Sequence, residues 1–533
     1  MIAFAPVAIL LLAALILALL QRLRPSIGYS WLTGSLFSLA ALGLMVFLRW
    51  KLPLQVAVSG WLPFSQFTDS PIFSLDGSSW PYALCMTAVM ASVMLTASAR
   101  LSYRINPWAW VGALLVASTS LMAIYAANLL TLVLAWTAID LLDLVILSSY
   151  SENRSLGVQT VIAFSMRVTG MVMVILAALI NRSQGIPPTF DGLPALSSFI
   201  LLLSVGLRLG VLPLNLPALP DMRVRRGLGT ILRMGAAASS LVVLARLPAK
   251  PFSPGLEGWL VAFAVLAVLY AAGMWMSAVD AIAARPYWLI ALAGMAVVSA
   301  LRGEPRAGLA WGTALLLSGS LIFLYSASMR GTLALPLLGL LGLMALPFTP
   351  AAEGWVGVLK GNFTIWELLL LLAHLLLLLG YLRFAVRAGD SLRDMERWVQ
   401  VVYPFGLGLL VAAQWMVGTI GWAGALTVGV WWAALATGVG LAVAGGLWLL
   451  LIRVELGASG PIKWYITSAR RVGGFVSQVF SLGWLYTLLW SVYRLLEQAI
   501  HVLTDILEGT GGVMWVFVLL ALFASLLVSR LSP

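Results

Sequence analysis

The 533-residue chain is poor in cysteine, histidine and charge, and each deficit removes a class of function. Its single cysteine, Cys85, has no partner for an intrachain disulfide, and no set of thiolates is available for an iron–sulfur cluster or a zinc centre. The two histidines, His374 and His501, are too few for paired haem ligation. Only 9% of the residues are charged, against about 25% in a typical soluble protein. These deficits exclude a soluble fold, and we expect no cofactor in this chain.

Long apolar runs replace the missing charge. The chain is 62% hydrophobic, and its mean hydropathy is +1.02. The runs are continuous over about 17–25 residues, the length that crosses a bilayer as a helix, and they do not alternate as the strands of a membrane barrel do. The sequence therefore predicts an all-α, polytopic membrane helical bundle of about 14–16 transmembrane helices. The predicted spans lie near residues 3–20, 31–49, 80–98, 108–125, 128–150, 158–180, 196–212, 227–247, 256–278, 287–301, 307–327, 332–348, 363–386, 401–421, 425–452 and 513–531.

The net charge of +12 is distributed unevenly between the predicted loops. Basic residues collect in alternate loops and the intervening loops hold fewer, which is the positive-inside pattern. The pattern predicts a multi-pass protein of the cell inner (plasma) membrane with its N-terminus outside, in contact with the lipid bilayer and not with nucleic acid. The residues that carry the pattern are Arg22, Arg24, Arg100, Arg104, Arg223, Arg225, Arg226, Arg383, Arg387, Arg393, Arg397, Arg470 and Arg471.

The apolar run Asn128–Tyr150 carries two carboxylates, Asp140 and Asp143. A charge at the bilayer centre costs roughly 2.5–3.5 kcal/mol on insertion scales, so intramembrane acids usually face a partner or a wet cavity. Their spacing of three residues places both on one face of a helix. Arg208, in a later span, is a candidate counter-charge for Asp140. Arg167 either pairs with one of the two acids or extends toward the interface.

The stretch 456–509 differs from the spans before it. Within Leu482–Glu508, apolar residues recur at helical spacing and are interrupted by charged residues. This pattern is typical of a long amphipathic helix that lies along a surface. Two interpretations remain open, an interfacial connector and a brace that docks on a neighbouring subunit. The last predicted span would anchor its end.

Several short motifs follow one another along the chain. They are Gly60-Trp61-Leu62-Pro63 with Phe73–Ser78, Asn128–Trp136, Arg167–Gly170, Pro213-Leu214 with Leu219–Asp221, the three residues Asp280, Tyr287 and Gly294, and Leu346-Pro347. In order and spacing they resemble the antiporter-like membrane subunits of respiratory complex I (NADH-quinone oxidoreductase) and of Mrp-type cation/proton antiporters. The resemblance covers roughly residues 30–450, and residues 456–533 resemble the C-terminal extension of the longest of these subunits.

The resemblance implies two inverted repeats of five helices each, with broken helices at the membrane midplane. It divides the chain into N-terminal spans and an external loop (1–107), a first repeat (108–250), a second repeat (251–400), C-terminal core spans (401–455) and an amphipathic lateral helix with a terminal anchor span (456–533). The expected broken-helix positions are Pro213, Pro217, Pro220 and Pro347.

The chain departs from the family where the family carries protons in its first repeat. Thr137 stands where the family has a glutamate directly after the tryptophan of the fifth span. Asp140, one turn farther on the same face, can replace that glutamate, whereas an alignment on Ser148–Tyr150 puts Asp143 there. Arg208 stands at the position of the family's lysine on the seventh span.

The departures continue toward the second repeat. Arg233 falls in the family's histidine-bearing stretch and is either a relay substitute or a charge near the interface. Ser318-Gly319-Ser320 replaces the central lysine, and the predicted spans between Arg208 and Ser328 contain no lysine or histidine. His374 is either protonatable or a hydrogen-bonded packing residue. The candidates for a proton or ion path are Asp140, Asp143, Arg167, Arg208, Arg233 and His374, and no catalytic or metal-binding residue is expected.

These substitutions change what the chain can do. A buried lysine can lose its proton near neutral pH, but an arginine, with a pKa above about 12, cannot. Arg208 is therefore expected to be a fixed counter-ion. The function expected is that of a membrane-arm subunit of a complex-I-like proton-pumping oxidoreductase, with a degenerate proton path, a scaffold role and other membrane subunits as partners. The alternative is an active proton- or sodium-translocating subunit of a multisubunit cation/proton antiporter, a membrane hydrogenase or an inorganic-carbon uptake complex.

Overall fold

The computed structural model describes residues 2–23, 30–58, 70–100, 107–149, 154–190, 192–215, 224, 226–248, 254–329, 331–359, 364–387, 389–426 and 431–455, together with a few isolated residues between 490 and 522. The chain forms two compact units, Met1–Trp464 and Tyr465–Pro533. The predicted amphipathic helix Leu482–Glu508 and the predicted span 513–531 belong to the second unit. Apart from those isolated positions, both lie outside the described residues.

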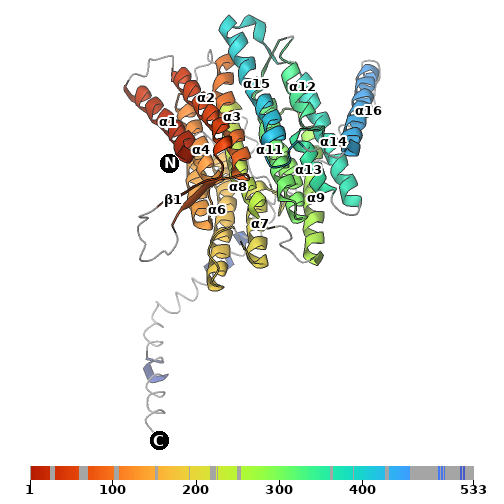
Figure 1. The fold of residues 1–533 in the computed structure, drawn as a ribbon. Helices are drawn as coiled ribbons and strands as arrows, with labels where there is room; N and C mark the ends of the chain where they lie inside the picture. Colours follow the sequence, from red (N-terminus) through yellow and green to blue (C-terminus); the bar gives the residue numbers. More distant parts are fainter. Residues whose placement is uncertain are drawn as a thin grey trace. The chain divides into compact units, whose positions relative to one another are not determined.

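The first unit is a bundle of helices (Figure 1). In chain order the helices are α1 (Ala5–Leu23), α2 (Ser30–Leu48), α3 (Ser79–Thr96), α4 (Trp108–Ile124), α5 (Leu129–Ser149), α6 (Arg154–Ser183), α7 (Ala195–Leu209), α8 (Arg226–Arg246), α9 (Pro254–Ser277), α10 (Arg285–Leu301), α11 (Pro305–Leu324), α12 (Ala334–Leu341), α13 (Pro350–Val358), α14 (Ile365–Val386), α15 (Arg397–Ile420) and α16 (Trp431–Glu455).

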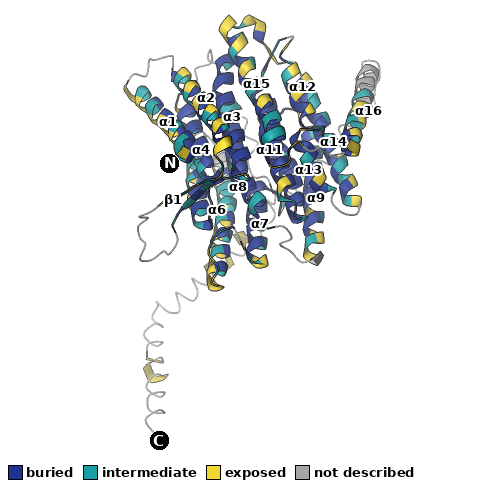
Figure 2. Ribbon diagram, in the orientation of Figure 1, coloured by how far each residue is buried: buried dark blue, intermediate teal, exposed yellow. Residues whose placement is uncertain are grey.

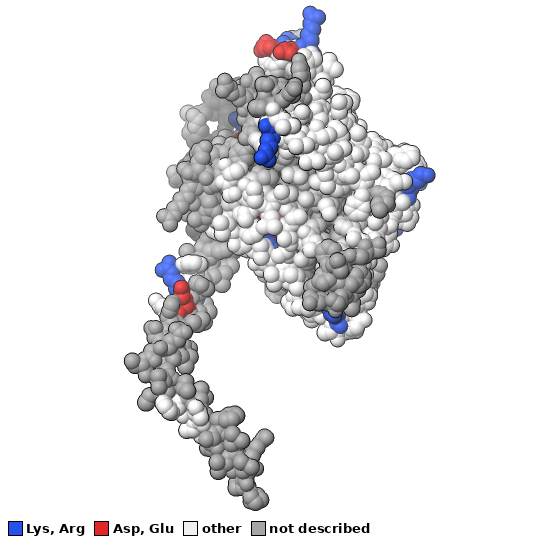
Figure 3. Space-filling model, turned by 90° about the vertical axis from the view of Figure 1, so that its left-hand side faces the viewer, with Lys and Arg blue, Asp and Glu red and all other residues white. Residues whose placement is uncertain are grey.

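The apolar runs of the sequence become these helices because, in lipid, a helix satisfies every backbone donor and acceptor within one segment. Within the described residues, ten helices are long and apolar enough to cross a membrane, and α4, α7, α10 and part of α16 are shorter apolar helices. This confirms the predicted all-α polytopic bundle. Every residue of α3 is buried, whereas α6 exposes much of its surface (Figure 2). On the face shown in Figure 3 charged side chains are few, as expected for a surface that contacts lipid.

Within the described residues, two of the predicted spans are not helical throughout. The first, α7, ends at Leu209, and Gly210 takes the left-handed conformation (φ 77°) that ends helices. The break therefore begins before Pro213, the position that the sequence favoured. Pro217 and Pro220 lie outside the described residues.

The second interruption separates α12 from α13, and Pro347 lies between them. Ala345 and Phe348 have positive φ values of 48° and 65° in this connection. The predicted span 332–348 is thus only partly helical, and it is followed by the helix α13, in a region where the sequence predicted no span. Pro350 opens α13, and proline suits the first helical position because the backbone N–H there has no partner within the helix.

Short strands connect the helices. β1 (Leu54–Ala57) pairs antiparallel with β2 (Ile72–Leu75), with Leu54 opposite Leu75. A parallel pair, β3 (Ala327–Ser328) with β4 (Asp390–Ser391), ties the end of α11 to the segment before α15. The motif Gly60–Pro63 lies outside the described residues.

Candidate functional site

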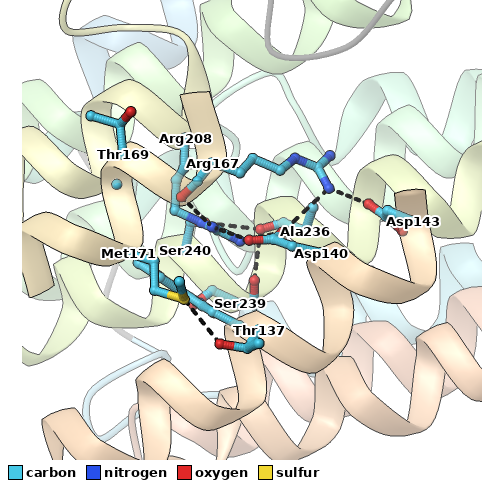
Figure 4. Close-up of polar contacts among 12 residues, drawn as sticks. Thr137, Asp140, Asp143, Arg167, Thr169, Met171, Arg208, Ala236, Ser239 and Ser240 are labelled. Carbon is cyan, nitrogen blue, oxygen red and sulfur yellow. Dashed lines mark hydrogen bonds and ion pairs between the residues drawn. The ribbon is translucent and has the colours of Figure 1, made fainter. Parts of the chain in front are cut away.

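The two intramembrane acids are placed by α5. Asp140 and Asp143 lie on one face of this helix, and each residue is only 3% exposed. That face meets α6 and α7, which carry Arg167 and Arg208 (Figure 4). The structure therefore brings together four of the residues that the sequence singled out, and we call Asp140, Asp143, Arg167 and Arg208 the charge cluster.

Arg208 holds Asp140 with both arms of its guanidinium. One Nη atom lies 2.6 Å from Oδ2 of Asp140 and the other lies 2.9 Å from Oδ1. The guanidinium also stacks on the ring of Trp136, 4.0 Å from its centroid, and its Nε donates to the hydroxyl of Ser240 at 3.4 Å. The side chain of Arg208 is 1% exposed. Such a bidentate pair fixes the orientation of both groups as well as their charge.

Arg167 joins the two acids. Its guanidinium forms an ion pair with Asp143, and one Nη lies 3.5 Å from Oδ1 of Asp140. The carbonyl oxygen of Arg167 accepts a hydrogen bond of 3.2 Å from Arg208. Of the two interpretations that the sequence left open, the structure therefore has Arg167 paired with the acids. Among the described residues, Oδ1 of Asp143 has no hydrogen-bond partner.

Small residues let α6 and α7 approach closely enough to close the charge cluster. The hydroxyl of Ser204 donates to the carbonyl of Gly170 at 2.6 Å. A Cβ on Gly170 would lie 2.9 Å from Cγ of Arg208, so this position has no room for a side chain. Gly170 closes the motif that begins at Arg167, and the contact gives a physical reason for a glycine there.

Thr137, at the position of the family's glutamate, does not join the charge cluster through any of its described contacts. Its hydroxyl bonds to the carbonyl of Val133 at 2.8 Å and to the sulfur of Met171 at 2.9 Å. The acids that α5 buries are instead Asp140 and Asp143.

The buried polar residues on α11, α14 and α15 include Ser318, His374 and Gln414. Gln414 on α15 donates to the hydroxyl of Ser318 at 2.9 Å and to the carbonyl of Gly339 at 3.3 Å. His374 accepts a hydrogen bond of 3.1 Å from the indole N–H of Trp355. The ring of His374 is buried against Trp311 and Trp355. This is the hydrogen-bonded packing arrangement, one of the two interpretations that the sequence left open for His374.

Arg233 lies apart from the charge cluster. It is 7% exposed on α8, and one Nη donates to the carbonyl of Gly229 at 3.3 Å. Its charged neighbours include Arg285, which begins α10. The sequence gave no reason to single out Arg285, because an arginine beside a loop is usually exposed.

Glu367 lies in the first turn of α14. It forms a capping box with Thr364 and an ion pair of 2.6 Å with Arg302. The threonine–glutamate spacing before an apolar run signals such a cap. In the part of the chain that the structure describes, no group of three His, Cys, Asp or Glu residues is placed to hold a metal ion.

The chemistry of the charge cluster follows from its composition. Two aspartates face two arginines, so the formal charges cancel. Arginine does not release its proton under ordinary conditions, so neither cation can relay one. The pair Asp140–Arg208 joins α5 to α7, and Arg167 joins α6 to both.

The fold of the bundle is similar to that of chains in two solved membrane complexes. One similar structure is that of the membrane-bound sulfane sulfur reductase (MBS), an archaeal respiratory membrane complex. It aligns over 97% of this chain and 99% of that chain, with 16% sequence identity and a TM-score of 0.66.

A second similar structure is that of the Mrp complex from Dietzia sp. DQ12-45-1b. It aligns over 95% of this chain but only 63% of that chain, with 14% identity and a TM-score of 0.67. No family model matches the sequence, and no curated protein matches it. The likeness therefore lies in the fold.

Proposed function

We propose that this chain is a membrane-arm subunit of a complex-I-like multisubunit assembly, in which it serves as a scaffold with a degenerate proton path. The observation that carries the proposal is the bidentate contact of Arg208 with Asp140, at 2.6 and 2.9 Å. It replaces a titratable lysine–acid pair by one whose cation keeps its proton.

The second half of the bundle supports the same proposal. A conducting chain needs groups that gain and lose protons, or water, between the charge cluster and the far side. The described interior there is packed with aromatic side chains, including Trp275, Trp288 and Tyr381, and its polar pair Ser318–Gln414 is uncharged. Serine and glutamine are poor proton carriers without water between them.

The similarity to chains of membrane complexes supports a role beside other membrane subunits. We place other membrane subunits beside this chain, with electron transfer handled elsewhere in the assembly. The alternation of basic loops supports the inner (plasma) membrane with the N-terminus outside. An NADH-quinone oxidoreductase-like assembly is one candidate for the whole.

Two measurements test the proposal. The tagged chain, isolated from its native membranes in mild detergent, should co-purify with other membrane subunits. In proteoliposomes, an imposed pH gradient and membrane potential should drive no more proton or sodium uptake through the chain than through its Asp140→Asn variant. A monodisperse chain without partners in native membranes would contradict the subunit role.

One observation favours a second candidate, active proton or sodium translocation. Oδ1 of Asp143 has no hydrogen-bond partner among the described residues, and the neighbouring Arg167 side chain is 13% exposed. If Asp143 loads an ion, uptake into proteoliposomes should be measurable and should disappear in the Asp143→Asn variant. That result would replace the scaffold by a translocating subunit of a cation/proton antiporter or a related complex.

A further inference from the structure

A second group of cations, two buried and one partly buried, is formed by α8 and α10. Arg226 and Arg233 lie two turns apart on α8, and Arg285 is the first residue of α10. Arg285 is fully buried, at 0% exposure, and Arg233 is 7% exposed. We call Arg226, Arg233 and Arg285 the arginine cluster. The charge pattern of the sequence predicts that it lies on the cytoplasmic side of the bundle.

Gly229 shows how closely these guanidinium groups approach one another. A Cβ on Gly229 would lie 2.6 Å from Nη1 of Arg285 and 3.4 Å from Nη1 of Arg233. Two arginines therefore place donor atoms around one point on α8. The remaining Nη of Arg285 donates to the carbonyl of Arg226 at 3.2 Å, which binds the start of α8 to the start of α10.

The described charges around Arg285 are mostly positive. Among the described residues, the charged groups that act on it are three cations, Arg233, Arg226 and Arg100, and one acid, Asp280. Within the described parts of the chain, Nε and Nη1 of Arg285 have no hydrogen-bond partner. Burying an unpaired cation in a protein costs roughly several kcal/mol of desolvation free energy. Unused donors on a fully buried guanidinium therefore point to a missing anion.

Helix ends add to the preference for negative charge. Arg226 and Arg285 begin their helices, and the N-terminus of a helix carries partial positive charge. The planar guanidinium fork matches the oxygens of a phosphate group. Phe323 lies against Arg285, with its ring centroid 5.4 Å from the guanidinium carbon, which limits access of water to that side.

We propose that the arginine cluster is a binding site for a phosphate group, supplied by an anionic phospholipid headgroup or by inorganic phosphate. Arg285 donates from Nε and Nη1, and Arg233 contributes the second charge. The ligand neutralises the junction between α8 and α10. This site is independent of the scaffold role, because it does not involve the charge cluster and is present whether or not the chain conducts ions.

The test follows the thermal unfolding of the purified full chain by tryptophan fluorescence. In lipid-free neutral detergent, inorganic phosphate is titrated against chloride at constant ionic strength. In parallel, nanodiscs of phosphatidylglycerol are compared with nanodiscs of phosphatidylcholine, and native mass spectrometry records bound phosphate or phospholipid. A saturable rise in Tm with free phosphate identifies the inorganic ion as a ligand. A rise only with phosphatidylglycerol, with retained phospholipid, identifies a headgroup.

The Arg285→Met variant decides whether the effect belongs to the arginine cluster. The apparent affinity for the effective anion should fall by roughly 10- to 100-fold, the factor that corresponds to losing charge-assisted hydrogen bonds. Arg285→Lys keeps the charge and loses the planar guanidinium, so its apparent affinity for the anion should lie between those of the unaltered chain and Arg285→Met. It replaces Arg285→Met in the test if the methionine variant does not fold. Arg393→Met, at an exposed arginine, should bind like the unaltered chain.

Either of two outcomes overturns the proposal. One is the absence of any rise in Tm of the unaltered chain with phosphate and with phosphatidylglycerol, which would mean that the cluster is neutralised by the chain itself. The other is an equal rise in the unaltered chain and in both Arg285 variants, which would place the anion elsewhere.

Discussion

The first half of the bundle (α4–α8) and the second half (α9–α15) bury different kinds of polar group in the middle of their helices. In the first half, the charge cluster buries full charges and cancels them by pairing, with Arg208 held at 2.6 and 2.9 Å from the two oxygens of Asp140. In the second half, the polar groups buried in the middle of the helices are neutral, such as the Gln414–Ser318 pair and His374, which packs against two indole rings. The buried charges of that half, Arg285 and Glu367, lie in the first turns of α10 and α14.

The difference teaches where sequence change is tolerated inside a membrane. A neutral polar side chain can be exchanged at a cost near that of one hydrogen bond, about 1 kcal/mol. A charged one cannot be removed alone, because its partner is left buried and unpaired, which typically costs about 3–5 kcal/mol. Substitutions in the charge cluster should therefore be tolerated less well than substitutions at the neutral Gln414–Ser318 pair.

The largest effect is expected from breaking the bidentate pair. Arg208→Ala should lower the free energy of unfolding by about 3–5 kcal/mol, because Asp140 loses its main counter-ion. Arg208→Lys keeps the charge and should cost clearly less. Thermal unfolding in detergent and recovery of the native complex measure both, with Thr169→Ala on the exposed face of α6 as the control. Equal tolerance of the alanine and lysine variants would show that Arg208 is not a fixed counter-ion.

The two acids should differ from each other. Asp140→Asn removes the charge that faces both arginines and should approach the cost of Arg208→Ala. Asp143→Asn should cost about 1.5–3 kcal/mol, the range for hydrogen bonds to charged groups, because Asp143 binds only Arg167 among the described contacts. The same unfolding measurement compares them. A larger loss of unfolding free energy in Asp143→Asn than in Asp140→Asn would show that the ion pair with Arg167 stabilises the bundle more than the pair with Arg208.

A smaller effect tests the packing beneath the charge cluster. Gly170→Ala should cost about 1–3 kcal/mol, the usual range for overpacking, because its methyl group would crowd Cγ of Arg208. Gly273→Ala is the matched control, since nothing lies within 4 Å of its added Cβ, and it should leave the unfolding midpoint unchanged or raised. Identical shifts in the two variants would mean that the contact between α6 and α7 is not tight.

The smallest effect is expected in the second half. Ser318→Ala should cost about 1 kcal/mol, because Gln414 loses one acceptor and keeps the carbonyl of Gly339. Combining it with Gln414→Leu should cost less than the sum of the single changes, since both partners are then apolar. The unfolding midpoints of the unaltered chain, the two single variants and the double variant form a double-mutant cycle that measures this difference. A loss comparable to that of Arg208→Ala would remove the contrast between the two halves.

The sequence by itself determined most of the helices, because an apolar run of span length has few alternatives in lipid. It also placed Asp140 and Asp143 on one face, since the helical repeat decides that without knowledge of the neighbours. It identified Arg208 as a candidate partner from charge alone. It did not locate the end of α7, where Gly210 and not Pro213 stops the helix, or the helix α13.

Only the tertiary structure decided which charge faces which. The bridge of Arg167 to both acids depends on the rotation of α6, and the close approach of Arg208 depends on the lack of a side chain at Gly170. The burial of Arg285 depends on how α8 and α10 meet, which no local pattern encodes. Helical periodicity assigns a side chain to a face of its own helix, but the energy of a buried ion is set by the neighbouring helix that this face meets.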